Sequence, residues 1–173
     1  MVVVPGIGGS GEGHWQTLWE RRFPGWKRAI QEDWDHPVCR KWVERLDQAI
    51  GDCPAPPVLV AHSLGCLTVV HWAACASRAV RAALLVAVPD PTSPSFPPAA
   101  QGFQPVPSTK LAFPSLVVAS SNDPFGSVDF AARCAARWGS EFVDIGAAGH
   151  INAESALEEW PAGFALLQRV VLR

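Results

Sequence analysis

The sequence predicts an α/β fold in which a mostly parallel central sheet of about six strands carries helices on both faces. Short apolar runs, such as Val58-Leu59-Val60, alternate with helical stretches along the whole chain. These runs are continuously apolar, as in strands that are covered on both faces of a parallel sheet. The 173 residues, of which 49% are hydrophobic and 17% charged, suffice for one buried core. We therefore expect residues 1–173 to form a single domain.

The expected strands lie at residues 2–4, 27–31, 57–61, 82–88, 115–120 and 141–145. The expected helices lie at residues 14–22, 38–50, 64–77, 128–138 and 162–171. In the first of these helices, Trp15, Leu18 and Trp19 have the i, i+3, i+4 spacing of a face that packs on a sheet. Most of the eight tryptophans lie in the first quarter of the chain, and we expect them to pack helices onto the sheet. The alternative is a substrate pocket lined by tryptophan.

Residues 89–114 interrupt this alternation. The segment contains eight prolines and follows the carboxyl end of a predicted strand. Ligands of open α/β sheets bind at that edge. The segment is therefore either a lid or binding loop, or a stiff crossover that covers an edge of the sheet.

The composition excludes several classes of function. A formal net charge of −2 gives no electrostatic basis for binding nucleic acid or an anionic membrane. No apolar run approaches the ~20 residues that span a bilayer, and no basic leader precedes Val2-Val3-Val4, so we expect no signal peptide. The five cysteines include no C-x-x-C pair, which argues against a disulfide framework or a zinc site. We expect a cytoplasmic protein without metal or cofactor.

Ser63 is the first candidate for a reactive group. The apolar run at residues 57–61 leads directly into His62-Ser63-Leu64-Gly65, and a helical stretch follows. A strand, a sharp turn and a helix around G-x-S-x-G form a nucleophile elbow, which exposes the serine hydroxyl. Here Ala61 replaces the first glycine, and its small side chain still allows strand and helix to approach closely. Because a serine that merely begins a helix gives the same short motif, the prediction depends on partners elsewhere.

Two such partners follow predicted strands. Asp123 comes after the strand at residues 115–120, and His150 lies in a small-residue loop after the strand at residues 141–145. His150 would take the proton of Ser63, and Asp123 would orient the imidazole. Taken alone, Asp123 would equally suit a turn before Pro124. The order Ser63, Asp123, His150 is the order of α/β hydrolases, which differs from that of chymotrypsin and subtilisin.

A glycine-rich turn, Pro5-Gly6-Ile7-Gly8-Gly9, follows the first strand. A backbone N–H in such a turn can face the negative charge of a tetrahedral intermediate. We expect the oxyanion hole to consist of the N–H groups of Leu64 and Ile7, with Gly8 as the alternative to Ile7. Phosphate binding is disfavoured because the spacing is not G-x-G-x-x-G and no Gly-Lys-Ser/Thr occurs.

Asp33, Asp35 and His36 form a second polar cluster, and its spacing fits no standard zinc site. We expect a turn there, with polar groups that cap the helix beginning near Val38.

Together these motifs resemble the small serine hydrolases of the retinoblastoma-binding-protein-9 and YdeN type, within the α/β-hydrolase superfamily. The resemblance extends over nearly the whole chain and rests on P-G-I-G-G-S, D-W-D-H-P, A-H-S-L-G, S-N-D-P-F, G-H-I-N and W-P-A-G. The chain departs from the family before Trp160-Pro161, where Ser155-Ala156-Leu157-Glu158-Glu159 replaces a glycine-rich stretch. The resemblance implies a compact α/β-hydrolase fold without a large cap domain. It also implies the triad Ser63, Asp123 and His150.

These features predict a serine hydrolase that cleaves a small ester, thioester or amide through an acyl-enzyme intermediate. The expected partner is a small acyl substrate, and a protein partner is left open. Two alternatives stand beside this prediction. One is a non-catalytic protein-interaction module on a hydrolase fold, and the other is an acyltransferase that uses the same triad.

Overall fold

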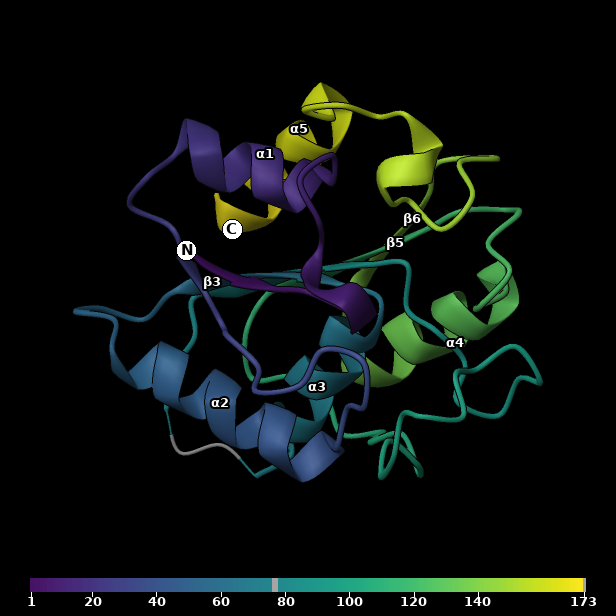
Figure 1. The fold of residues 1–173 in the computed structure, drawn as a ribbon, viewed down its shortest axis with the longest axis horizontal. Coiled ribbons are helices and arrows are strands. Elements are labelled where there is room, and N and C mark those ends of the chain that lie inside the picture. The colour runs from purple at the N-terminus through teal and green to yellow at the C-terminus, as the bar shows by residue number, and fades with distance from the viewer. Residues whose placement is uncertain (76–77, 173) are drawn as a thin grey trace.

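The computed structural model describes residues 1–75 and 78–172 (Figure 1). At its centre lies a sheet of six parallel strands in the order β2-β1-β3-β4-β5-β6. The strands are β1 (Val2–Val4), β2 (Lys27–Arg28), β3 (Val58–His62), β4 (Ala82–Val86), β5 (Ser115–Ala119) and β6 (Glu141–Asp144). The predicted parallel sheet is confirmed. β2 is shorter than the expected residues 27–31, because its partner β1 ends before Pro5, which has no N–H to donate.

The described residues form five α-helices: α1 (Trp15–Arg22), α2 (Cys39–Gly51), α3 (Leu64–Ala73), α4 (Val128–Trp138) and α5 (Pro161–Val171). The first four connect successive strands, and α5 follows β6. Two short 3₁₀ turns are added, η1 (Ile7–Gly9) and η2 (Ala153–Ser155). Four of the helices lie within one residue of the predicted boundaries. The helix expected at residues 64–77 ends at Ala73, and residues 76–77 lie outside the described part of the chain.

The helices form two layers. Figure 1 shows α1 and α5 on one face of the sheet and α2, α3 and α4 on the other. Alternate residues of β3 face the two layers: Val58 and Val60 pack toward α1 and α5, and Leu59 and Ala61 toward the opposite layer. All residues of β3, β4 and β5 are buried, which explains why these strands are continuously apolar in sequence.

The tryptophans fill the spaces between helices and sheet. Trp15, Trp19, Trp42, Trp72 and Trp138 are all fully buried. In the layer of α1 and α5, the ring of Trp15 lies 4.7 Å from that of Trp19 and 5.1 Å from that of Trp160, between ring centroids. Gly163 has no side chain because a Cβ there would collide with the Trp160 indole, which gives the W-P-A-G motif a packing reason. The packing role predicted for the tryptophans is confirmed.

The proline-rich segment 89–114 crosses from β4 to β5 without regular structure and is anchored along its length. Phe103 and Leu111 are buried in the same core cluster as α2, α3 and α4. The indole of Trp138 donates a hydrogen bond of 2.8 Å to the carbonyl of Pro107, and the Leu111 N–H donates to the Trp138 carbonyl at 2.9 Å. These contacts hold the second half of the segment against the core, while its first half contributes Pro89, Phe96 and Pro97 to the wall of a cavity.

The cluster at Asp33 is a turn. Its carboxylate accepts hydrogen bonds of 2.9 Å from the backbone N–H groups of Asp35 and His36. The expectation that these groups cap the next helix is wrong, because α2 begins at Cys39 with no side-chain cap. The carboxylate is instead occupied by its own turn.

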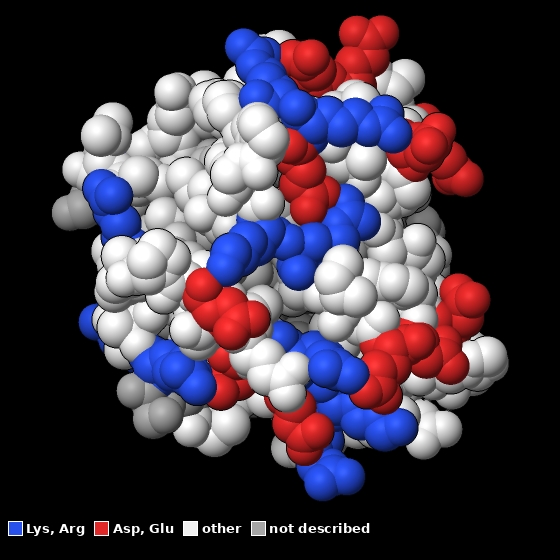
Figure 2. Space-filling view, turned by 60° about the vertical axis from the view of Figure 1, so that its left-hand side comes forward, with Lys and Arg blue, Asp and Glu red and all other residues white. Residues whose placement is uncertain are grey.

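The hydrophobicity of the helices and the distribution of charged side chains on the surface bear on possible partners. In the part of the chain that the structure describes, no helix is long and apolar enough to cross a bilayer. On the face shown in Figure 2, Lys and Arg side chains lie interspersed with Asp and Glu side chains, as expected for a net charge of −2.

Candidate active site

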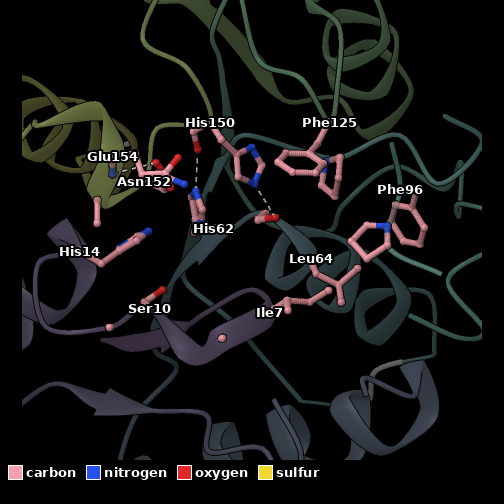
Figure 3. Close-up of a pocket in the computed structure, with 16 residues that line it drawn as sticks. Ile7, Ser10, His14, His62, Leu64, Phe96, Phe125, His150, Asn152 and Glu154 are labelled. Atoms are coloured by element: carbon pink, nitrogen blue, oxygen red, sulfur yellow. Dashed lines mark hydrogen bonds between the residues drawn. The ribbon is translucent and has the colours of Figure 1, made fainter. Parts of the chain in front are cut away.

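A cavity of about 380 Å³ lies at the carboxyl ends of the strands. Its walls come from loops that follow four different strands: the turn after β1, the β3–α3 turn, the start of segment 89–114 and the loop after β5. The segment around η2, which follows β6, closes one side (Figure 3). All of the predicted site residues except Asp123 line this cavity, and Asp123 lies behind His150.

Ser63 stands in a sharp turn between β3 and α3. Its backbone has φ 53° and ψ −125°, a region that non-glycine residues rarely adopt. The turn fits only because the neighbouring chain is small: a Cβ on Gly65 would collide with the Val4 carbonyl, and one on Gly6 would lie 2.8 Å from the Ser63 Cβ. The predicted strand, turn and helix are therefore present, and the strained turn directs the serine hydroxyl into the cavity.

The structure brings Ser63, His150 and Asp123 together in one chain of hydrogen bonds. The Nε2 atom of His150 lies 2.8 Å from the Ser63 hydroxyl, and its Nδ1 atom lies 2.9 Å from both Asp123 carboxylate oxygens. The Asp123 side chain is only 2% exposed and also accepts a 2.9 Å hydrogen bond from the Phe125 N–H. A carboxylate at Nδ1 favours the tautomer that leaves the Nε2 lone pair for the serine proton.

The loop that carries His150 is held by two side chains that sequence reasoning missed. The Asn122 side-chain oxygen accepts a 2.7 Å hydrogen bond from the Gly149 N–H, and the Ser120 hydroxyl accepts one of 2.9 Å from the Ala148 N–H. The Ser120 hydroxyl in turn donates to Asn122. The sequence signal that could have pointed to Ser120 and Asn122 is the run of polar residues that ends a predicted strand directly before Asp123.

His62 and Trp15 hold the same loop from the other side. The Nε2–H of His62 donates to the His150 carbonyl at 2.9 Å, and the Trp15 indole donates to the Ile151 carbonyl at 2.8 Å. Burial, with smaller contributions from His14 and His150, holds the pKa of His62 well below its usual value. His62 is therefore neutral. Its ring centroid lies 5.0 Å from that of His150, so a neutral His62 places no positive charge beside His150.

The two predicted donors of the glycine-rich turn, Ile7 and Gly8, differ in whether their N–H is already bonded. The Gly8 N–H donates to the Trp34 carbonyl at 3.2 Å and is thereby occupied. The N–H groups of Ile7 and Leu64 have no acceptor among the described residues, and both residues line the cavity next to Ser63. Of the two predicted alternatives, this geometry favours Ile7 over Gly8.

The cavity has an apolar side and a polar side. Figure 3 shows Ile7, Leu64, Phe96 and Phe125 to the right of the His150 imidazole. Ser10, His14, Asn152 and Glu154 lie on the opposite side. None of the described residues that line the cavity is Trp, Lys or Arg, so the tryptophan-lined pocket is not what the structure shows.

His14 forms part of the polar wall and is the N-cap residue of α1. Its Nδ1 accepts a 3.1 Å hydrogen bond from the Gln16 N–H, and Gln16 is tied to the sheet through the Val60 carbonyl at 2.9 Å. Burial lowers the pKa of His14 to about 4, with smaller contributions from Arg28 and His150. Among the described residues, no group of three or more His, Cys, Asp or Glu side chains is placed to hold a metal ion.

Comparison with known families places this geometry in context. A family model described as "Serine hydrolase" matches residues 1–169. No curated protein is detectably similar to the chain in sequence.

Solved structures give closer comparisons. A protein of Pectobacterium atrosepticum described as a YdeN-like hydrolase has 36% sequence identity and a TM-score of 0.87, covering 99% of this chain and 89% of its own. The ydeN gene product of B. subtilis has 17% identity and a TM-score of 0.81, covering 99% and 98%. A thermophilic esterase from Thermogutta terrifontis has 17% identity and a TM-score of 0.67, covering 99% and 88%. The latter two similarities show the fold alone.

Proposed function

Since the chain belongs to the serine hydrolase family, we propose that it cleaves a small ester, thioester or amide through an acyl-enzyme intermediate on Ser63. The observation that carries this proposal is the hydrogen-bonded chain from Ser63 through His150 to the buried Asp123. Ser63 faces a cavity, and beside it lie the backbone N–H groups of Leu64 and Ile7, which bond to no acceptor in the described part of the chain. Nothing in the packing of the fold requires these groups to meet.

In the proposed reaction, the His150 Nε2 accepts the hydroxyl proton as the Ser63 oxygen attacks the substrate carbonyl. The negative charge of the tetrahedral intermediate then lies at the N–H groups of Leu64 and Ile7. Collapse of the intermediate breaks the bond to the leaving group, which takes the proton from His150. A water molecule, deprotonated by the same imidazole, then releases the acid and restores Ser63.

The neighbouring histidines favour this proton transfer. During the reaction His150 carries a positive charge, which Asp123 stabilises from the Nδ1 side. His62 and His14 are both kept neutral by burial, so neither adds an opposing charge. All five cysteines carry free thiols, which suits the cytoplasmic location that we propose.

Covalent labelling with a fluorophosphonate tests the proposal. We expect one adduct, located on Ser63 by mass spectrometry, and no adduct in Ser63→Ala. Ser121→Ala is the matched control, because it removes an exposed hydroxyl at the same edge of the sheet without touching the hydrogen-bonded chain. Ser63→Ala should also lose p-nitrophenyl ester hydrolysis by several orders of magnitude.

Two results would contradict the proposal. Unchanged ester hydrolysis by Ser63→Ala would remove Ser63 as the nucleophile. A folded wild-type protein that forms no adduct would favour the protein-interaction module. If the adduct forms, product analysis with an added alcohol separates hydrolysis from acyl transfer.

A further inference from the structure

The side chain of His14 contains a buried donor for which residues 1–75 and 78–172 provide no acceptor. Because Nδ1 accepts the Gln16 N–H, and a neutral imidazole carries one proton, that proton resides on Nε2. His14 is only 4% exposed, and its Nε2 has no hydrogen-bond partner among the described residues. Buried polar atoms are nearly always paired, so an unpaired one at a cavity wall calls for an acceptor from outside the chain.

The groups around His14 restrict which acceptor suits the site. The Ser10 hydroxyl donates to the Gln16 side chain at 2.6 Å, so its oxygen can only accept a further bond. The Glu154 carboxylate also accepts only, and it lies on the same polar side of the cavity (Figure 3). No Lys or Arg lies among the described lining residues. Arg28, which contacts the Gly9 carbonyl behind this wall, is already paired with Glu20. A carboxylate or phosphate would therefore face Glu154 without an unpaired cation in the cavity lining, whereas an uncharged group that both accepts and donates is matched.

We propose that His14 is a specificity-determining residue, whose Nε2–H binds a hydroxyl oxygen on one side of the bond to be cleaved. The hydroxyl hydrogen then faces the acceptors of the same wall, Ser10 or Glu154. The apolar part of the substrate lies against Phe96, Phe125 and Leu64 on the other side. The proposal rests on the proposed function and adds the substrate class: a hydroxylated ester, thioester or amide with an apolar opposite side.

The Nε2 atom is itself shielded from water in the structure. A substrate oxygen therefore reaches it through a shift of the neighbouring side chains, and the bond then forms in a dry environment. Hydrogen bonds in such surroundings discriminate between a hydroxyl group and a methyl group, since the analogue without the hydroxyl leaves the donor unpaired.

Two pairs of esters, each differing by a hydroxyl in place of a methyl group, test this. 2-Hydroxyethyl butyrate against propyl butyrate places the hydroxyl on the alcohol side. Methyl 3-hydroxybutanoate against methyl 3-methylbutanoate places it on the acyl side. Acid release measured at constant pH gives kcat/KM for each ester. We expect the wild type to prefer the hydroxylated member of one pair by about fivefold to tenfold, and the responding pair shows which side enters the polar wall.

Two variants of His14 remove the Nε2–H in different ways. His14→Asn keeps an acceptor for the Gln16 N–H at the start of α1, because asparagine is a good helix N-cap, and its shorter amide group ends before the position of the imidazole Nε2. His14→Phe keeps a ring against Trp15 and His62. In both, the preference ratio should fall to about one, and this ratio is independent of the fraction of folded enzyme. His36→Asn, at an exposed position, is the matched control and should keep the wild-type ratio.

A wild type without preference in either pair would overturn the inference, as would variants of His14 that retain the preference. Failure of the proposed function has a different signature, namely ester hydrolysis that survives in Ser63→Ala. The two failures are therefore separated within the same set of assays.

Discussion

The Asp123 carboxylate is nearly inaccessible to solvent and fully occupied by hydrogen bonds, so its replacement gives a clean test. Asp123→Asn should lower kcat on a p-nitrophenyl ester by about a thousandfold or more, because an amide no longer fixes the His150 tautomer or stabilises its positive charge. The fold should persist, since the substitution conserves shape. Asp144→Asn is the control: its carboxylate, at the end of β6, accepts the Gly146 N–H and lies outside the hydrogen-bonded chain of Ser63, His150 and Asp123. A severe loss in Asp144→Asn with normal rates in Asp123→Asn would move the acid to Asp144.

The residues around Ser63 differ in whether their positions could be predicted from the sequence. The proximity of Ser63, Asp123 and His150 could be predicted because each directly follows an apolar run, and parallel strands bring their carboxyl ends to one edge. Asn122 was overlooked, although it lies in the polar run next to Asp123. Trp15 could not be found, because its bond to the Ile151 carbonyl joins positions 136 residues apart and no local pattern marks it. His62 was hidden for the same reason, since its acceptor is a backbone carbonyl 88 residues away. Such partners follow from the three-dimensional packing rather than from local pattern.

At the scale of elements, the closeness of β1 and α3 decides the shape of the elbow. Gly65→Ala should lower the free energy of unfolding by about 3 kcal/mol, because the added methyl group collides with the Val4 carbonyl and the two elements must separate. The same shift should move Ser63 away from His150 and lower kcat. Urea denaturation and ester hydrolysis measure the two effects. Gly25→Ala is the control, since a Cβ there meets nothing within 4 Å. Equal stability of the two variants would contradict this account.

The elements themselves were largely predictable. Buried strands and amphipathic helices carry period-specific patterns, which is why α4 was predicted with its observed limits, Val128–Trp138. The end of α3 was not predictable, since the apolar residues continue beyond Ala73 and no glycine or proline marks the boundary. The length of β2 was also hidden, because it depends on how many residues β1 presents for pairing.

For the whole molecule, the buried histidines predict acid sensitivity. His14 is neutral in the folded protein, with a pKa of about 4 against an ordinary 6.5, so the unfolded chain binds its proton more readily. The contribution of neutral His14 to the free energy of unfolding is complete above pH 6.5 and is lost as the pH falls toward 4. The full pKa shift corresponds to about 3 kcal/mol. His62 acts in the same direction. Urea denaturation at pH 7.5 and 4.5 should show this loss, reduced in His14→Asn and unchanged in His36→Asn. Identical pH dependence in all three proteins would refute the assignment.

The hydrogen bonds between α1 and the last part of the chain have a consequence during synthesis. The indoles of Trp15 and Trp19 donate to the carbonyls of Ile151 and Glu159, which are 136 and 140 residues away. A ribosome adds about 5–20 residues per second, so the residues whose carbonyls accept these hydrogen bonds are synthesised roughly 7–28 s after the two tryptophans. Throughout that interval the side of these rings that faces Trp160 in the folded protein stays uncovered. The demand for chaperone protection is therefore greatest before the last helix emerges.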